Sequence, residues 1–131
     1  TVRGFLAGRD LDWRERLGHF PDGGRRAAER AARARDLELL DERLRADGLL
    51  EEDAGTDARV LAVHRFLART RATLAAVQLE DLAGEIEQAN LPGTIDEHPN
   101  WRRRLGLDLD AALETPTAGR ILAAMRAERP R

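Results

Sequence analysis

The 131-residue chain contains neither cysteine nor lysine. The lack of cysteine excludes a disulfide framework and thiolate metal sites, and it agrees with a cytoplasmic protein. No apolar run approaches the roughly 20 residues that a bilayer span requires, and we find no signal peptide. We therefore expect no membrane partner, and the sequence predicts no metal ion and no cofactor.

All 22 basic residues are arginine, and they are interleaved with 24 acidic residues. Such arginines are either ordinary helix formers supplied by a GC-rich coding sequence or a surface for nucleic acid. The net charge of −2 leaves no uncompensated basic field that would attract phosphates, so we expect no nucleic-acid partner. With 42% hydrophobic and 35% charged residues, the chain is typical of a globular protein rich in exposed helix.

Most of the chain has helical periodicity. Apolar residues recur at three- and four-residue steps through residues 25–46, which predicts a long helix that Gly48 ends. Thr56 is expected to cap the next helix, and Thr115 another whose first residue is Pro116. Shorter helices are expected over residues 12–17 and 108–114.

Residues 73–77 are continuously apolar and partly β-branched, which favours a parallel strand covered on both faces. Helical segments precede and follow it, as in βα units. The chain offers only one weak partner strand, residues 2–6. We therefore predict a mostly α protein with one or two short strands. Because the other strands must lie elsewhere and no methionine opens the chain, we also expect it to be truncated.

A long irregular connection, residues 85–104, follows the predicted strand, at the end where α/β barrels build active sites. Its two asparagines can donate and accept as sugar hydroxyls require, its tryptophan offers a flat apolar face, and its Pro-Gly pair favours a tight turn. Alternatively, the tryptophan plugs the barrel end and the asparagines cap turns. The candidate substrate-binding residues are Asn90, Pro92, Gly93, Asn100 and Trp101.

Four carboxylates, Glu80, Asp81, Glu85 and Glu87, cluster near this segment. Retaining glycosidases need two carboxyl groups about 5–5.5 Å apart. We expect these four to be solvated or bonded to loop amides rather than catalytic. His64 lies at the edge of an apolar helix face without a second ligand at metal-binding spacing, so we interpret it as a packing residue.

Three stretches carry a specific resemblance. Residues 77–85, residues 88–94 with the run NLPGT, and residues 96–103 with the run PNWR resemble the C-terminal signature of amylomaltase-type 4-alpha-glucanotransferases. Residues 1–5 are similar to the segment that follows the family's His-Asp motif. The resemblance extends over the whole chain, but the specific motifs lie within residues 77–103.

The resemblance implies a (β/α)8 TIM barrel enzyme that transfers α-1,4-glucan segments between maltodextrins by retaining double displacement. The family's catalytic carboxylates lie upstream of the position matching Thr1. Residues 1–131 are then the C-terminal portion of the barrel, with the last strand, its flanking helices and the active-site loop. The chain would hold no catalytic residue, and alone we expect it to be inactive and loosely packed or aggregated.

The resemblance also implies maltodextrin or a starch-derived oligosaccharide as partner. Asn90 and the Pro92-Gly93 turn would line donor-side sugar sites, while Asn100 and Trp101 would shape or anchor the loop. Other interpretations are a small helical protein-interaction module, which needs residues 74–77 to be helical, and an RNA-binding helix, which the balanced charge disfavours. A hydrolase that shares the barrel also stays open.

Overall fold

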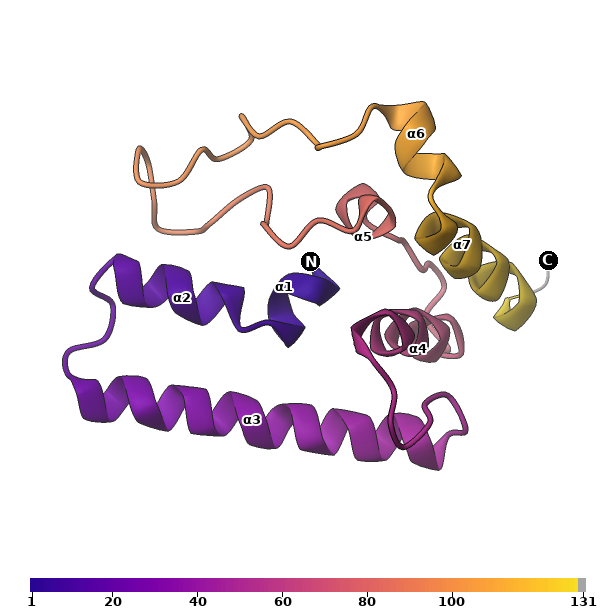
Figure 1. Ribbon diagram of the computed structural model, residues 1–131, viewed down its shortest axis with the longest axis horizontal. Helices are drawn as coiled ribbons and strands as arrows, with labels where there is room; N and C mark the ends of the chain where they lie inside the picture. The colour runs from indigo at the N-terminus through magenta and orange to yellow at the C-terminus, as the bar shows by residue number, and fades with distance from the viewer. Residues whose placement is uncertain (130–131) are drawn as a thin grey trace.

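The computed structural model describes residues 1–129, and within them every regular element is a helix. Figure 1 shows the long α3 running along one side of the molecule, with α1 and α2 beside it and α7 at the opposite end from α2. The helices are α1 (Val2–Leu6), α2 (Arg9–Arg16), α3 (Gly23–Ala46), α4 (Thr56–Ala68), α5 (Leu79–Ala83), α6 (Leu109–Glu114) and α7 (Pro116–Glu128).

Local sequence sets most of these helix ends. The Asp22 carboxylate accepts from the backbone N–H of Arg25 at 2.7 Å, so α3 begins two residues before the predicted start. Gly48, with φ +66°, follows its end as predicted. The prediction for Thr56 was wrong: Gly55 occupies the N-cap position, and Thr56 is the first helical residue.

Thr115 confirms its predicted role. Its hydroxyl oxygen accepts from the backbone N–H of Ala118 at 3.0 Å and so caps α7. The same hydroxyl lies 2.8 Å from the carbonyl oxygen of Leu82 and donates to it. Because Leu82 belongs to α5, this single side chain both starts α7 and attaches it to α5.

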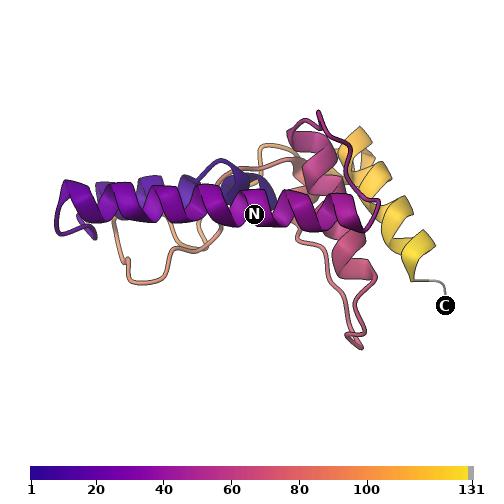
Figure 2. The ribbon, with the colours of Figure 1, turned by 90° about the horizontal axis from the view of Figure 1, so that it is seen from below.

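The predicted strands are absent from the described residues. Residues 2–6 form helix α1, capped by the Thr1 hydroxyl, and residues 73–77 are irregular, with the Leu74 side chain 86% exposed. A strand requires a ladder partner, and none of residues 1–129 supplies one. The helical alternative for residues 74–77 was also wrong, because α4 ends at Ala68. Figure 2 shows this segment looping away from the helices.

Two apolar clusters hold the helices together, and α4 contributes to both. One joins the end of α3 to α4, and the other joins α4, α5 and α7. At the far end of α7, the Glu128 carboxylate accepts from Arg69, the residue that follows α4, and from Arg65 of α4, and these bonds lower its pKa to about 2. The buried members are Leu44, Leu49, Leu50 and Ala62 in the first cluster and Val60, Leu82, Ala118 and Ile121 in the second.

Candidate functional site

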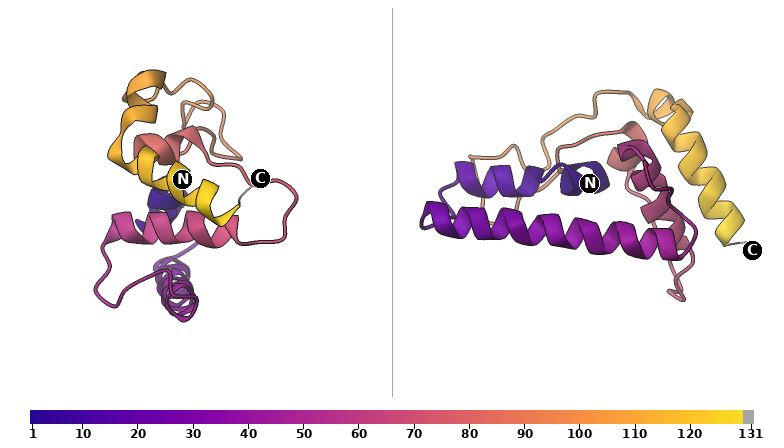
Figure 3. Two further views of the ribbon diagram at one scale, coloured as in Figure 1. Left: turned by 90° about the vertical axis from the view of Figure 1, so that its right-hand side faces the viewer. Right: turned by 60° about the horizontal axis from the view of Figure 1, so that its bottom comes forward.

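The irregular segment between α5 and α6 lies alongside α1 and α2, as Figures 1 and 3 show. It leaves α5 at Gly84, whose φ of +76° ends that helix. It then passes so close to α1 that a Cβ on Gly4 would lie 2.3 Å from the carbonyl oxygen of Ile86. The same carbonyl accepts from the Thr1 hydroxyl at 3.0 Å. Helix α1 therefore fixes where the segment starts.

The predicted turn at Pro92 and Gly93 is confirmed. Gly93 has a φ of +84°, the conformation that the third position of a type II turn requires. Leu91, before the turn, is buried, and its carbonyl accepts from the Thr94 hydroxyl at 2.6 Å. Both turn residues are exposed.

Asn100 holds this turn from inside. Its Oδ1 accepts from the backbone N–H of Leu91 at 2.8 Å and lies 2.9 Å from Nδ1 of His98. Its Nδ2 donates to the carbonyl of Thr94 at 3.0 Å and to the Thr94 hydroxyl at 2.8 Å. The whole hydrogen-bonding capacity of this amide is used within the loop.

Trp101 closes the loop with its backbone and leaves its ring outside. Its N–H donates to the carbonyl of Ala89 at 2.9 Å, which joins the two limbs. Its φ of +56° is unusual for a bulky residue and costs about 1–2 kcal/mol. Trp101 is 78% exposed, whereas Asn90, which follows Ala89 on the other limb of the loop, is half-buried. All five candidate residues thus lie on one closed loop, residues 89–101.

Three of the clustered carboxylates make structural contacts. Glu85 accepts from the backbone N–H of Gly106 at 2.8 Å, and Asp81 accepts from that of Val2 at 2.7 Å, as expected for carboxylates bonded to amides. Glu87 pairs with side chains of α2 instead. Burial tends to raise the pKa of Glu87, but its contacts with Arg9 and Trp13 outweigh burial and lower it.

The side chains that hold the loop against α2 were not predicted from the sequence. His98 is fully buried, and its ring meets the ring of Trp13 edge-on, with centroids 4.9 Å apart. The indole N–H of Trp13 donates to Glu87 at 2.9 Å. Trp13 therefore touches both limbs of the segment. The only signal was the position of His98 inside the distinctive motif, because Trp13 lies 85 residues earlier in the chain.

His64 is buried, in agreement with the packing interpretation, but it also has a charged neighbour. Its Nδ1 lies 2.8 Å from the carbonyl of Val60, and its Nε2 lies 3.7 Å from the Asp81 carboxylate of α5. Burial opposes the charged ring, yet Asp81 and the Val60 carbonyl together raise the pKa of His64. Burial also opposes the charged Asp81, whose pKa is nevertheless lowered by His64 and the Val2 N–H.

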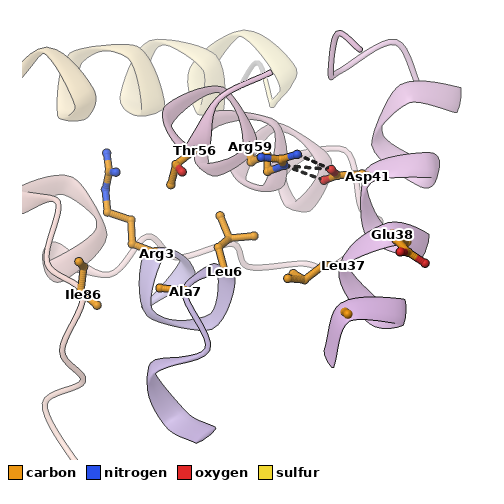
Figure 4. Close-up of a pocket in the computed structure, with 10 residues that line it drawn as sticks. Arg3, Leu6, Ala7, Leu37, Glu38, Asp41, Thr56, Arg59 and Ile86 are labelled. Atoms are coloured by element: carbon orange, nitrogen blue, oxygen red, sulfur yellow. Dashed lines mark hydrogen bonds and ion pairs between the residues drawn. The ribbon is translucent and has the colours of Figure 1, made fainter. Parts of the chain in front are cut away.

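A hollow of about 650 Å³ lies between α1, α3 and α4 (Figure 4). The guanidinium of Arg59 and the carboxylate of Asp41 line it and bind each other at 2.8–3.1 Å. Ile86 is the lining residue that comes from the segment after α5, and the five candidate residues do not line the hollow. The hollow and the loop are therefore separate features.

Residues 1–129 show neither a metal centre nor a membrane span. No group of three histidine, aspartate or glutamate side chains in this part of the chain is arranged to hold a metal ion. Among the helices described above, none has both the length and the apolar composition for crossing a bilayer.

The helices thus carry one closed loop on which Trp101 and the Pro92-Gly93 turn are exposed. Comparison with known proteins identifies the class of protein: the sequence profile of the 4-alpha-glucanotransferase family matches residues 1–109. The chain belongs to the 4-alpha-glucanotransferase family.

Its relatives include 4-alpha-glucanotransferases of Mycobacterium tuberculosis and Mycobacterium bovis, each 41% identical over 101 residues, or 76% of this chain. The 4-alpha-glucanotransferase of Haemophilus influenzae is 30% identical over 117 residues, or 83% of this chain. The matches cover only 14% and 17% of these relatives. No solved structure matches the chain.

Proposed function

We propose that this chain supplies a sugar-binding loop to a 4-alpha-glucanotransferase that transfers α-1,4-glucan segments between maltodextrins by retaining double displacement. The observation that carries the proposal is the closed loop 89–101, which comprises most of the distinctive family motifs and holds an aromatic ring and a Pro-Gly turn open to solvent. The family match supports it. The substrate is a maltodextrin or a starch-derived oligosaccharide, and the setting is cytoplasmic.

Each candidate residue has a role that its geometry suits. The Trp101 ring offers a flat apolar face to a pyranose and excludes water from it. The Pro92-Gly93 turn presents backbone groups at the donor side without side-chain obstruction, and Asn90 adds an amide that can both donate and accept. Asn100 acts indirectly, since its amide is occupied in holding the turn.

We further propose that residues 1–131 are the C-terminal portion of a (β/α)8 barrel, with no catalytic carboxylate among them. Residues 73–77 would then be its last strand. In favour of this, the segment is apolar and lies outside every helix, and Leu74 is 86% exposed. A neighbouring strand would give this backbone its ladder and cover that side chain.

The test is a hybrid enzyme in which this chain replaces the matching segment of the Mycobacterium tuberculosis relative. We expect the hybrid to disproportionate maltotriose. Trp101→Ala should raise its KM about tenfold, which corresponds to the loss of about 1.4 kcal/mol of stacking. The matched control is Leu39→Ala, which removes an exposed side chain of α3. A folded hybrid without activity would refute the proposed function, and an unchanged KM in Trp101→Ala would remove Trp101 from the site.

A further inference from the structure

His98 is the one fully buried imidazole of the loop, and its surroundings define which ring nitrogen carries the proton. The orientation of the Asn100 amide is fixed because its Nδ2 faces the carbonyl of Thr94, which can only accept. Oδ1 of Asn100 therefore faces Nδ1 of His98, at 2.9 Å. Oδ1 of Asn100 is a hydrogen-bond acceptor and already accepts from the Leu91 N–H. The nitrogen that faces it must be a donor, so Nδ1 of His98 carries the hydrogen.

The other nitrogen has a different environment. Nε2 of His98 is buried and has no hydrogen-bond partner among residues 1–129. The chemical contribution of the ring to the loop thus comes from Nδ1–H alone. Asparagine places an N–H close to the position of Nδ1, whereas glutamine places one close to that of Nε2. Asparagine at position 98 therefore keeps the N–H of Nδ1, and glutamine at that position does not.

Helix α2 holds this imidazole in place. The Trp13 ring packs against it at an interplanar angle of 79°, an edge-to-face contact that favours one ring orientation. The indole N–H is itself fixed by Glu87, which also binds Arg9 of α2. The Trp13 ring is therefore held both by the backbone of α2 and by its hydrogen bond to Glu87.

From these contacts we propose that His98 is a positioning residue. Held by Trp13, its Nδ1–H orients Asn100, and Asn100 in turn fixes the turn between Leu91 and Thr94 and the adjoining Trp101 in the geometry that meets the sugar. The contacts from Trp13 to His98, Asn100 and the turn are all present in the structure. Their consequence for sugar affinity rests on the proposed function.

Hydrogen exchange tests the positioning role directly. We expect His98→Gln to speed exchange of the Leu91 and Trp101 amides about tenfold, since a neutral hydrogen bond contributes up to about 1.5 kcal/mol. His98→Asn should keep both rates within about twofold of the original. Equal effects of the two variants would overturn the proposal, because the ring would then only fill space. His19→Gln, at an exposed histidine outside the loop, is the matched control and should change neither rate.

A measurement without any substitution covers the case in which a variant fails to fold. The ¹⁵N chemical shifts of the His98 ring in the unaltered chain report its tautomer, and we expect hydrogen on Nδ1. Hydrogen on Nε2 alone would overturn the proposal.

Sugar affinity is measured separately by titrating maltoheptaose against tryptophan fluorescence, and His98→Gln should weaken it while His98→Asn should not. If the unaltered chain and the hybrid enzyme bind no maltoheptaose, the proposed function fails. The exchange rates and the tautomer still decide the role of His98. If maltoheptaose binds but His98→Gln and His98→Asn weaken it equally, the positioning role fails while the proposed function stands.

Discussion

Two glycines inside helices have opposite surroundings. Gly4 of α1 is buried, and a Cβ there would meet the carbonyl oxygen of Ile86 at 2.3 Å, so the backbone itself would have to shift. Gly119 of α7 has nothing within 4 Å of that position. The same substitution therefore separates a packing requirement from intrinsic helix propensity.

Gly119→Ala should raise the free energy of unfolding by about 0.5–1 kcal/mol, because alanine is the better helix former and restricts the unfolded chain. Gly4→Ala should lower the free energy of unfolding by about 1–3 kcal/mol. Alanine is the better helix former here too, but its Cβ would clash with the Ile86 carbonyl, and that cost outweighs the gain in helix propensity. Urea unfolding followed by far-UV circular dichroism measures both. A stabilised Gly4→Ala would mean that α1 does not pack against Ile86.

The loop residues also show how a residue's chemistry depends on its neighbours. Asn90 and Asn100 are the same amino acid and were both candidate substrate-binding residues, although the resemblance implied that Asn100 shapes or anchors the loop. The structure places Asn100 at the centre of four internal contacts, whereas Asn90 is half-buried at the start of the loop. The positions of Leu91, Thr94 and His98 give the physical reason for the difference between the two asparagines.

At the scale of elements, α4 connects the molecule. It packs against α3 on one side and α7 on another, and through His64 and Asp81 it is tied to α5, from which the loop departs. His64 and Asp81 are both buried away from water, so the charged form of each is stabilised by the other.

The pair predicts a pH dependence. The raised pKa of His64 means that its contribution to stability is complete below its unfolded value near 6.5 and is lost as the pH rises through the higher folded value. The lowered pKa of Asp81 means that its contribution is present above its unfolded value near 3.8 and is lost as the pH falls through the lower folded value. The pair therefore contributes most between about pH 4 and 6.5.

We expect the difference in Tm between the unaltered chain and His64→Gln to be larger at pH 5.5 than at pH 8.5. Thermal scans by circular dichroism at both values measure it. His19→Gln is the control and should leave Tm unchanged at either pH. A difference that does not vary with pH would show that His64 stays neutral and only fills space.

The whole molecule is extended rather than compact. Its solvent-accessible surface is 8575 Å², whereas a monomeric protein of 14.6 kDa typically exposes about 6,900 Å². The views in Figures 2 and 3 agree, since α3 and the loop project together beyond the packed helices. Several apolar side chains share in this exposure, among them Leu74, Ile95, Trp101 and Leu39.

Because less surface is buried on folding, the slope of unfolding free energy against urea concentration should be smaller for this chain than for a compact helical protein of the same length. Equilibrium urea titrations of both proteins, followed by circular dichroism, measure the two slopes. An equal slope would show that the chain in solution buries more surface than the structure does.

The features that were predictable from the sequence depend on short-range interactions. The helical periodicity, the Thr115 cap, the Gly48 terminator and the Pro92-Gly93 turn depend on residues a few positions apart, and each was predictable. The ordered motifs of residues 77–103 resemble those of the family, and the family match over residues 1–109 confirms that resemblance.

The remaining features depend on tertiary contacts, because the interacting residues lie far apart in the sequence. His98 meets Trp13 across 85 residues, and Val2 meets Asp81 across 79. No local pattern in residues 73–77 or 2–6 shows whether a neighbouring strand is available. A strand without a neighbour leaves its backbone N–H and C=O groups unpaired, whereas a helix pairs its own. Residues 73–77 therefore remain irregular, and residues 2–6 form helix α1.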